Sequence, residues 1–168
     1  MKRGFAPVVD AGTRLLILGS LPGDASLNVG QYYGHPRNAF WRLVGDVIGR
    51  DLPALPYEDR LTALKGAGIG LWDVIAGAER KGSLDTAIRN AEAADLPGLI
   101  DRLPNLKAIA FNGATAAKRG ARVLGPDTGA PVRLNLPSSS PALAKPLAWK
   151  AEHWARIAPY VASPTGRP

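Results

Sequence analysis

Short apolar runs bounded by glycine or proline alternate along this chain with longer stretches of helical periodicity. The apolar runs that stand out occupy residues 14–18 (RLLIL), 69–75, 106–111 (LKAIAF) and 132–136. Each leads into a segment rich in Gly, Pro, Ser or Asn, so each predicts a buried strand that ends in a loop. Because these strands alternate with helices, the pattern predicts an α/β fold: a three-layer α/β/α sandwich around a central, mainly parallel four-stranded sheet.

Helical spacing is clearest after Asn38. There Phe40, Leu43, Val44 and Val47 fall at positions i, i+3, i+4 and i+7, which places an apolar stripe on one face of a helix. This stripe is expected to pack on the sheet. Further helices are predicted at residues 58–65, 95–103, 113–118 and 147–158.

The chain has the size of one ordinary domain. Its 168 residues, of which 46% are apolar, suffice for one hydrophobic core. The prolines fall mostly at the ends of predicted elements, and the sequence shows no internal repeat and no interdomain linker. We therefore predict a single domain over residues 1–161, followed by a polar tail, residues 162–168, that frays.

The charge balance is basic. The chain has 21 Lys and Arg against 14 Asp and Glu, a net charge of +7 with a pI of about 10.1. Such a balance suits a polyanionic partner, because phosphate contacts are electrostatic and release counterions. Many basic proteins bind no nucleic acid, so charge alone does not identify the partner.

The absence of cysteine excludes disulfides, thiolate nucleophiles and cysteine-ligated zinc or iron–sulfur clusters. The two histidines, His35 and His153, are far apart in sequence, so we expect no protein metal site and no cofactor. No apolar run has the length of a signal peptide or of a membrane span. We expect a cytoplasmic monomer that does not contact membranes.

The predicted topology indicates where a ligand would bind. In open α/β sheets, ligands bind beyond the carboxyl ends of the strands. The loops expected there are residues 19–38, 72–76, 112–115 and 137–145.

The first of these loops has the most informative composition. Its glycines and prolines predict a rigid turn, while Tyr32, Tyr33, His35 and Asn38 offer a stacking face and hydrogen-bonding groups. Each residue also has a plain structural interpretation. The two tyrosines can be core or rim aromatics, His35 can be a structural histidine, and Asn38, which lies just before a helix, can be its N-cap.

Taken together, this segment resembles the first motif region of the uracil-DNA glycosylase superfamily, and most closely that of its hypoxanthine-DNA glycosylase family. The residues that carry the resemblance are GSLPG at 19–23, SL at 26–27, QYY at 31–33, HP at 35–36 and NAFW at 38–41. The mismatch-specific uracil glycosylases share the turn that ends in Pro-Gly and the HPxNxFW portion. The superfamily is therefore better supported than the branch.

The later loops carry shorter similarities in the same order. Residues 136–142 (LPSSSPA) resemble the second superfamily motif, a Pro-Ser loop that presses into the DNA minor groove. Residues 68–74 (GIGLWDV) resemble the strand whose polar residue reads the base edge, and Asn112-Gly113 resembles the turn beside the pocket.

The resemblance implies a monofunctional DNA-deoxyinosine glycosylase of base-excision repair. Such an enzyme flips a deaminated base out of DNA and hydrolyses its N-glycosidic bond. By motif position, Asn38 is the catalytic residue, Tyr33 stacks on the flipped base, and Asp73 reads its edge. The other residues expected to contact the base are Asn112, Ser20, Leu21, Pro22 and Gly23.

DNA contacts are expected from the second motif. The residues implied are Pro137, Ser138, Ser139, Ser140, Ala142 and Lys145, with further candidate phosphate contacts at Arg37, Lys118, Arg119 and Arg122. A serine run is otherwise usually a solvated loop, and any one of these cations can be a plain surface charge.

The sequence departs from much of the superfamily at two positions. Leu21 stands where several branches have an acidic or amide side chain that activates water, and Leu136 stands where the best-known uracil enzymes have a histidine. The hypoxanthine family shares both absences. Three alternatives therefore stay open: a uracil or mismatch-specific enzyme of the same superfamily, a catalytically silent DNA-binding relative, and an unrelated nucleotide hydrolase or ligand-binding protein. The last lacks support, because neither G-x-G-x-x-G nor a P-loop is present.

Overall fold

A central parallel sheet organises the structure, a computed structural model that describes residues 1–162. Its strands are β2 (Leu15–Gly19), β3 (Ile69–Asp73), β6 (Ala108–Asn112) and β7 (Val132–Leu136), in the order β3-β2-β6-β7. All neighbouring pairs are parallel. The predicted four-stranded sheet is confirmed.

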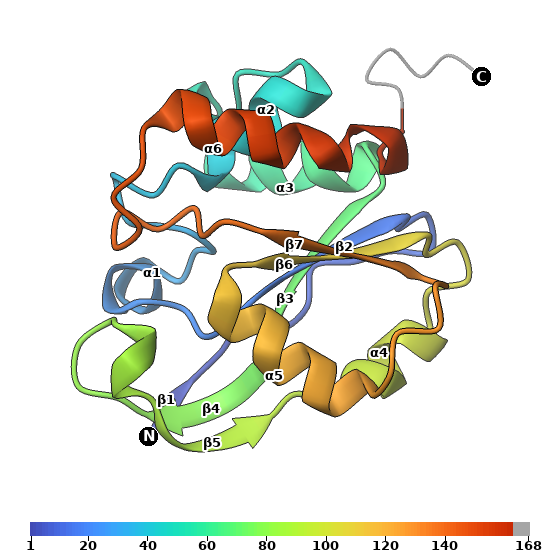
Figure 1. The fold of residues 1–168 in the computed structure, drawn as a ribbon. Helices are drawn as coiled ribbons and strands as arrows, with labels where there is room; N and C mark the ends of the chain where they lie inside the picture. Colours follow the sequence, from blue (N-terminus) through green and yellow to red (C-terminus); the bar gives the residue numbers. More distant parts are fainter. Residues whose placement is uncertain (163–168) are drawn as a thin grey trace.

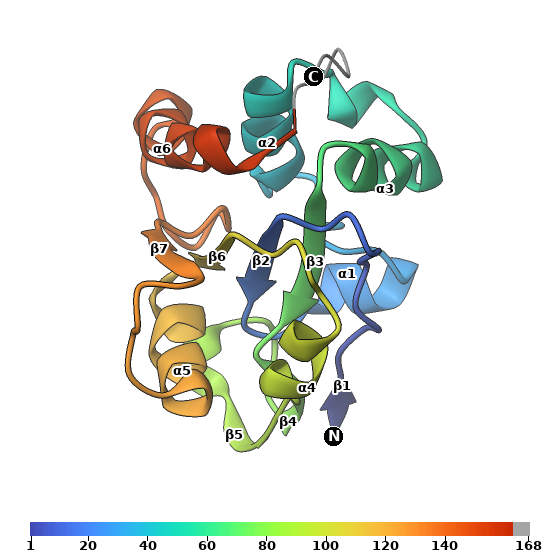
Figure 2. The same cartoon turned by 90° about the vertical axis from the view of Figure 1, so that its right-hand side faces the viewer.

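Helices cover both faces of this sheet (Figure 1). On one face lie α2 (Phe40–Ile48), α3 (Tyr57–Gly66) and α6 (Leu147–Trp154), which a 3-10 helix, Ala155–Tyr160, continues. On the other lie α4 (Leu96–Asp101) and α5 (Ala114–Leu124), also seen in the turned view of Figure 2. The predicted three layers are therefore present. Asp95 caps α4, because its side chain accepts a hydrogen bond from the Gly98 backbone N–H.

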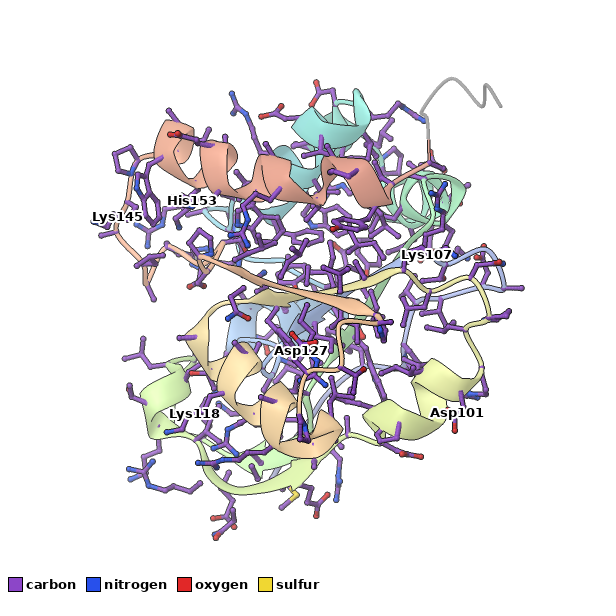
Figure 3. The ribbon with its side chains drawn as sticks, turned by 45° about the vertical axis from the view of Figure 1, so that its right-hand side comes forward. Asp101, Lys107, Lys118, Asp127, Lys145 and His153 are labelled. Carbon is purple, nitrogen blue, oxygen red and sulfur yellow. The ribbon has the colours of Figure 1, made fainter. Side chains whose placement is uncertain are left out.

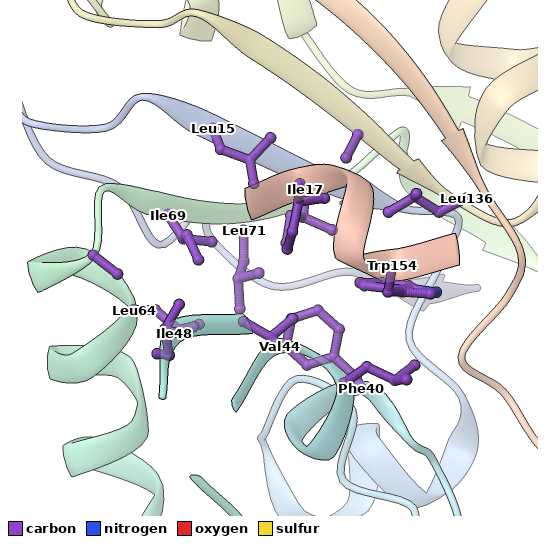
Figure 4. Close-up of a cluster of buried hydrophobic side chains, with 14 of the residues drawn as sticks. Leu15, Ile17, Phe40, Val44, Ile48, Leu64, Ile69, Leu71, Leu136 and Trp154 are labelled. Atoms are coloured by element: carbon purple, nitrogen blue, oxygen red, sulfur yellow. The ribbon is translucent and has the colours of Figure 1, made fainter. Parts of the chain in front are cut away.

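Alternating residues of the buried strands supply two separate cores. Leu15 and Ile17 of β2 pack with Phe40, Val44 and Trp154 under the α2–α3–α6 layer (Figure 4). Leu16 and Leu18 of the same strand point to the opposite face, into the core beneath α4 and α5. This alternation follows from the two-residue period of a strand and explains why residues 15–18 are all apolar.

The predicted strand 69–75 is wrong at its end. The parallel strand stops at Asp73, and the chain then enters a second, antiparallel sheet of β1 (Lys2–Arg3), β4 (Ile75–Glu79) and β5 (Arg89–Ala93). The backbone N–H groups of Val74 and Ile75 donate to the carbonyls of Gly19 and Ser20 at the crossing. Val74 and Ile75 are apolar and buried like the strand before them, so the hydrophobicity of the segment does not mark this change of sheet.

Three short helices also escaped prediction. They are α1 (Asp24–Val29), inside the predicted first loop, and the 3-10 turns Leu52–Ala54 and Asp85–Ala87. Gly30, at a φ of 68°, ends α1, as glycine does at many helix termini. The predicted fraying of residues 162–168 concerns mostly residues outside the described range. Within it, the Ala162 N–H donates to the Ala67 carbonyl. No helix among residues 1–162 is both long and apolar enough to span a membrane.

The packing of α5 on the sheet gives a stability prediction. Gly120 lies buried against the Phe111 ring, and a Cβ at this position would overlap that ring. We expect Gly120→Ala to lower the free energy of unfolding by about 1–3 kcal/mol, although alanine is the better helix former. The matched control is Gly66→Ala at the end of α3, where a new Cβ meets no atom within 4 Å. Urea unfolding of both variants tests this, and equal effects would contradict the packing.

Candidate active site

The carboxyl ends of the four parallel strands lie side by side and bring the predicted site loops together. Gly19 is in register with Asp73, and Asn112 with Leu136. In Figure 1 this edge of the sheet faces α1 and the segment that leads from β7 to α6. Segments separated by more than a hundred residues therefore contribute to one site.

Gly19 leaves space for two polar groups. A Cβ at this glycine would lie 2.6 Å from Asp73 Oδ1 and 3.1 Å from the Tyr33 hydroxyl. The Asp73 side chain and the Tyr33 hydroxyl therefore both approach the end of β2 where it has no side chain. Any larger residue at position 19 would displace them.

Tyr33 is held in an unusual conformation. Its φ of 53° lies in the left-handed region, which costs a non-glycine residue about 1–3 kcal/mol. In this conformation its ring stacks on Phe40, with centroids 3.9 Å apart and planes 16° from parallel. Phe40 therefore covers one face of the ring, and Tyr33 is also among the residues that line the cavity described below.

The Asp73 carboxyl group is buried, and one of its oxygens is left without a hydrogen bond. Its Oδ2 and the Tyr33 hydroxyl have no hydrogen-bond partner among the described residues. Burial, helped by repulsion from Asp85, raises the pKa of Asp73 to about 7. Burial and the neighbouring Asp73 also raise the pKa of the Tyr33 hydroxyl, and Asn112 opposes that rise. Unpaired buried polar atoms on two residues that both approach Gly19 indicate a place where a ligand completes the hydrogen bonding.

Asn38 precedes α2 and has a structural role as well. Its Oδ1 accepts a hydrogen bond from the Phe40 N–H at 3.0 Å, and its own N–H donates to the His35 carbonyl. The residue at the formal N-cap position is Ala39. The capping interpretation of Asn38 thus holds in part, and it leaves one lone pair of Oδ1 and the Nδ2 group for other partners.

Ser139 joins three segments of the site. Its hydroxyl accepts from Asn112 Nδ2 and its N–H donates to Asn112 Oδ1, both at 2.9 Å. Its carbonyl accepts from the N–H of Ala39. With 1% of its surface exposed, Ser139 is inside the protein. The side chains of Ser139 and Asn112, predicted to contact DNA and base, are therefore engaged with each other.

The rest of the second-motif loop is anchored from α6. Trp154 Nε1 donates to the Pro137 carbonyl and Lys150 Nζ to the Ser140 carbonyl. The Ser138 and Ser140 hydroxyls accept from the N–H groups two residues ahead, those of Ser140 and Ala142. Ala142 and Lys145 are exposed. The loop therefore presents an ordered backbone whose tip faces solvent.

The first turn, residues 20–23, is held by a residue that the sequence analysis missed. Arg80 of the β4–β5 connection has a fully buried side chain, which donates to the carbonyls of Leu21 and Pro22. The Ser20 hydroxyl donates to Asp85, and a new Cβ at Gly23 would meet Ser83. A lone arginine in an unpredicted strand region gives no sequence signal for this role.

A cavity of about 750 Å³ opens between the first loop, α2, α3 and the start of α6. Tyr33, Asn38 and Lys145 line it. Its cationic lining residues are Arg37, Arg42, Arg60, Lys145 and Lys150, and no Asp or Glu is among the described residues around it. Lys118, Arg119 and Arg122 lie on α5 and are not part of this lining. The cavity is thus suited to an anionic ligand.

Across residues 1–162, no three or more His, Asp or Glu side chains gather in a way that could hold an ion. The groups present at the site offer hydrogen bonds, an aromatic ring and positive charge.

The pKa of Asp73 predicts a pH-dependent stability. Between the ordinary carboxyl pKa of 3.8 and the folded value of about 7, the unfolded chain ionises while the folded protein keeps the proton. Asp73 therefore destabilises the fold increasingly as pH rises through this window. Asp73→Asn should raise the free energy of unfolding relative to wild type more at pH 8 than at pH 4.

Denaturant unfolding at the two pH values measures this difference. The control for the simple loss of a carboxylate is Asp101→Asn. Asp101 is exposed and is labelled in Figure 3. If Asp73→Asn raises the free energy of unfolding by the same amount at pH 4 and at pH 8, Asp73 is not buried in its neutral form.

Comparison with known proteins agrees with this geometry. Residues 6–161 match the model of the family described as the Uracil DNA glycosylase superfamily. A Methanosarcina barkeri protein named hypoxanthine DNA glycosylase is 54% identical over 112 residues, 67% of this chain and 71% of that protein. A protein of the same name from Methanosarcina acetivorans is 49% identical over 118 residues, 70% of this chain and 75% of its own.

A solved structure shares the fold. It is the solution NMR structure of a Methanosarcina acetivorans protein provisionally named a uracil DNA glycosylase. The two chains are 42% identical, with a TM-score of 0.80 over 93% of this chain and 95% of that one. The family match covers all the strands that build the site described above. The chain therefore belongs to the uracil DNA glycosylase superfamily.

Proposed function

We propose that this protein is a DNA N-glycosylase that removes hypoxanthine from deoxyinosine in DNA. The observation that carries the proposal is the pair of unpaired polar atoms at the sheet edge, Asp73 Oδ2 and the Tyr33 hydroxyl, beside a cation-lined cavity. Membership of the superfamily supports the reaction, and the names of two relatives at 54% and 49% identity support the base.

Stacking is the proposed role of Tyr33. A base inside duplex DNA is out of reach of protein side chains, so its nucleotide must first rotate out, at a cost of a few kcal/mol. Phe40 already covers one face of the Tyr33 ring. A purine on the other face would extend this stack, a contact worth about 1–3 kcal/mol by analogy with single-strand binders.

Recognition of the base edge is the proposed role of Asp73. Hypoxanthine presents an N1–H donor next to the O6 acceptor. A neutral carboxyl group matches both, because its carbonyl oxygen accepts from N1–H while its O–H donates to O6. The raised pKa of Asp73, caused mainly by burial, supports the neutral form near neutral pH. Ser20, Leu21, Pro22, Gly23 and Asn112 are the proposed surrounding wall.

Positioning of water is the proposed role of Asn38. Water adds to C1′ of the sugar as the bond from C1′ to N9 breaks, the bond electrons leave with the base, and one proton of the water ends on the released base. An amide cannot act as a strong base, but its carbonyl oxygen can hold the water and stabilise the cationic sugar. The hydrogen bond from the Phe40 N–H fixes the orientation of Asn38.

DNA is held electrostatically in this proposal. Arg37, Arg42, Arg60 and Lys145 would meet phosphates, and the ordered backbone of residues 137–142 would lie against the minor groove. Ser138, Ser140, Pro137 and Ala142 are proposed to contact DNA there. Ser139 would support the site through its hydrogen bonds to Asn112 and Ala39. We further propose that residues 1–161 work as one domain and as a cytoplasmic monomer.

Base release from labelled duplexes tests the function. Duplexes with deoxyinosine or deoxyuridine are incubated with excess EDTA, and alkali reveals the abasic sites. We expect release at deoxyinosine that survives EDTA and falls at least a hundredfold, on the order of one lost polar transition-state contact, in Asn38→Ala. Asn28→Ala, at an exposed position of α1 in the same loop and outside the lining of the cavity, is the matched variant with activity near wild type.

Other outcomes select the alternatives. Faster release at deoxyuridine would identify a uracil enzyme, since the N3–H and O4 of uracil present the same pattern of donor and acceptor. No release at either base by folded protein that still binds the duplex would leave a catalytically silent DNA-binding relative.

A further inference from the structure

Lys150 of α6 is a buried cation beside the proposed site. Only 4% of the residue is exposed, and its Nζ donates to the Ser140 carbonyl at 2.9 Å. The ion pairs among the described residues involve Lys2, Arg3 and Arg80. Lys150 thus has no carboxylate partner within residues 1–162. Burial lowers the pKa of its ammonium group.

An ammonium group in this position is costly unless something compensates it. Removing a charge from water is unfavourable when no opposite charge replaces the solvent. An ammonium has three N–H donors, and one protein carbonyl uses only one of them. If α6 needed only a link to the Ser140 loop, a neutral donor would serve, as Trp154 does for Pro137.

The surroundings of Lys150 identify the missing partner as an anion. Lys150 lines the same cavity as Asn38 and Tyr33, together with the other cations named above and with no acidic side chain among its described lining residues. The carbonyl that it contacts belongs to the serine loop proposed to meet DNA. A ligand that enters this cavity against Lys150 therefore meets a positive charge with two donors to spare.

We propose that Lys150 binds a backbone phosphate of the DNA strand that carries the flipped nucleotide. The inference rests on the proposed function and adds an anion subsite to it. The subsite consists of the Lys150 ammonium, set in place by the Ser140 carbonyl, on the α6 wall of the cavity. A phosphate there supplies the charge that the protein itself lacks, and it ties the position of the strand to the serine loop.

The salt dependence of DNA binding tests this subsite. The probe is a duplex with a tetrahydrofuran abasic analogue, so that no turnover occurs, and the dissociation constant is measured between 50 and 200 mM salt. Lys150→Gln keeps an N–H donor for the Ser140 carbonyl but removes the charge. Its slope of log affinity against log salt should be shallower by about 0.9, so the affinity loss over this range shrinks roughly 3.5-fold.

Two control variants separate the effect of the lost charge at position 150 from other effects of the substitution. Lys150→Arg keeps the charge and should keep the wild-type slope. Lys107→Gln changes the net charge equally just before β6, across the molecule from Lys145 in Figure 3, and should leave the slope unchanged. Thermal unfolding verifies that each variant is folded.

A wild-type slope in folded Lys150→Gln would overturn the proposal and leave Lys150 as a link between α6 and the loop. If Lys150→Gln does not fold, a slope in Lys150→Arg that is shallower by about 0.9 would overturn it as well. Both results differ from failure of the proposed function, in which wild-type protein releases neither base.

Discussion

The hydrogen bonds of one buried serine hold the site together. The side chain and backbone of Ser139 bind the Asn112 amide at the end of β6, and its carbonyl binds the N–H of Ala39 at the start of α2. These bonds connect the loop of Asn38 and Tyr33 to the sheet and to the second-motif loop. Each buried group left unsatisfied at such a junction would cost about 1–3 kcal/mol. The spacing between the proposed catalytic amide and the sheet edge depends on this junction.

The distribution of charge divides the site into two parts. At the sheet edge, burial favours the neutral form of Asp73, next to an uncharged tyrosine hydroxyl. In the adjoining cavity, the described lining carries positive charge only. A base can thus be read by neutral hydrogen-bonding groups while the phosphates that flank it meet cations. The small antiparallel sheet contributes through Arg80, whose buried guanidinium holds the turn that follows β2.

The elements with a clear periodicity could be predicted from the sequence. The strands that became β2 and β6 are apolar along almost their whole length because both faces of the sheet are covered, and α2 carries the expected stripe. At the edge of the sheet, β7 alternates apolar residues with Arg133 and Asn135. The change of sheet after Asp73 could not be seen, because Val74 and Ile75 are as buried as the strand before them. Hydrophobicity reports burial, and it does not report the partner strand.

The candidate site was predictable where a motif marks it and not where tertiary contacts make it. The loop with Tyr33 and Asn38, and Asp73 at the end of β3, lie around one edge of the sheet as expected. The mutual engagement of Ser139 and Asn112 depends on contacts between segments 27 residues apart, which no local pattern encodes. The same holds for Arg80 and Lys150, since a cation in a sequence is ordinarily a surface residue.

The position of a flipped base would show directly whether Tyr33 and Asp73 bind it. A crystal structure of wild-type protein with a duplex containing 2′-fluoro-deoxyinosine, which resists cleavage, would show it. We expect hypoxanthine to stack on the face of Tyr33 opposite Phe40, with N1 and O6 at hydrogen-bonding distance from the Asp73 carboxyl group, about 2.7–3.2 Å. A base bound elsewhere, with Asp73 still unpaired, would contradict it.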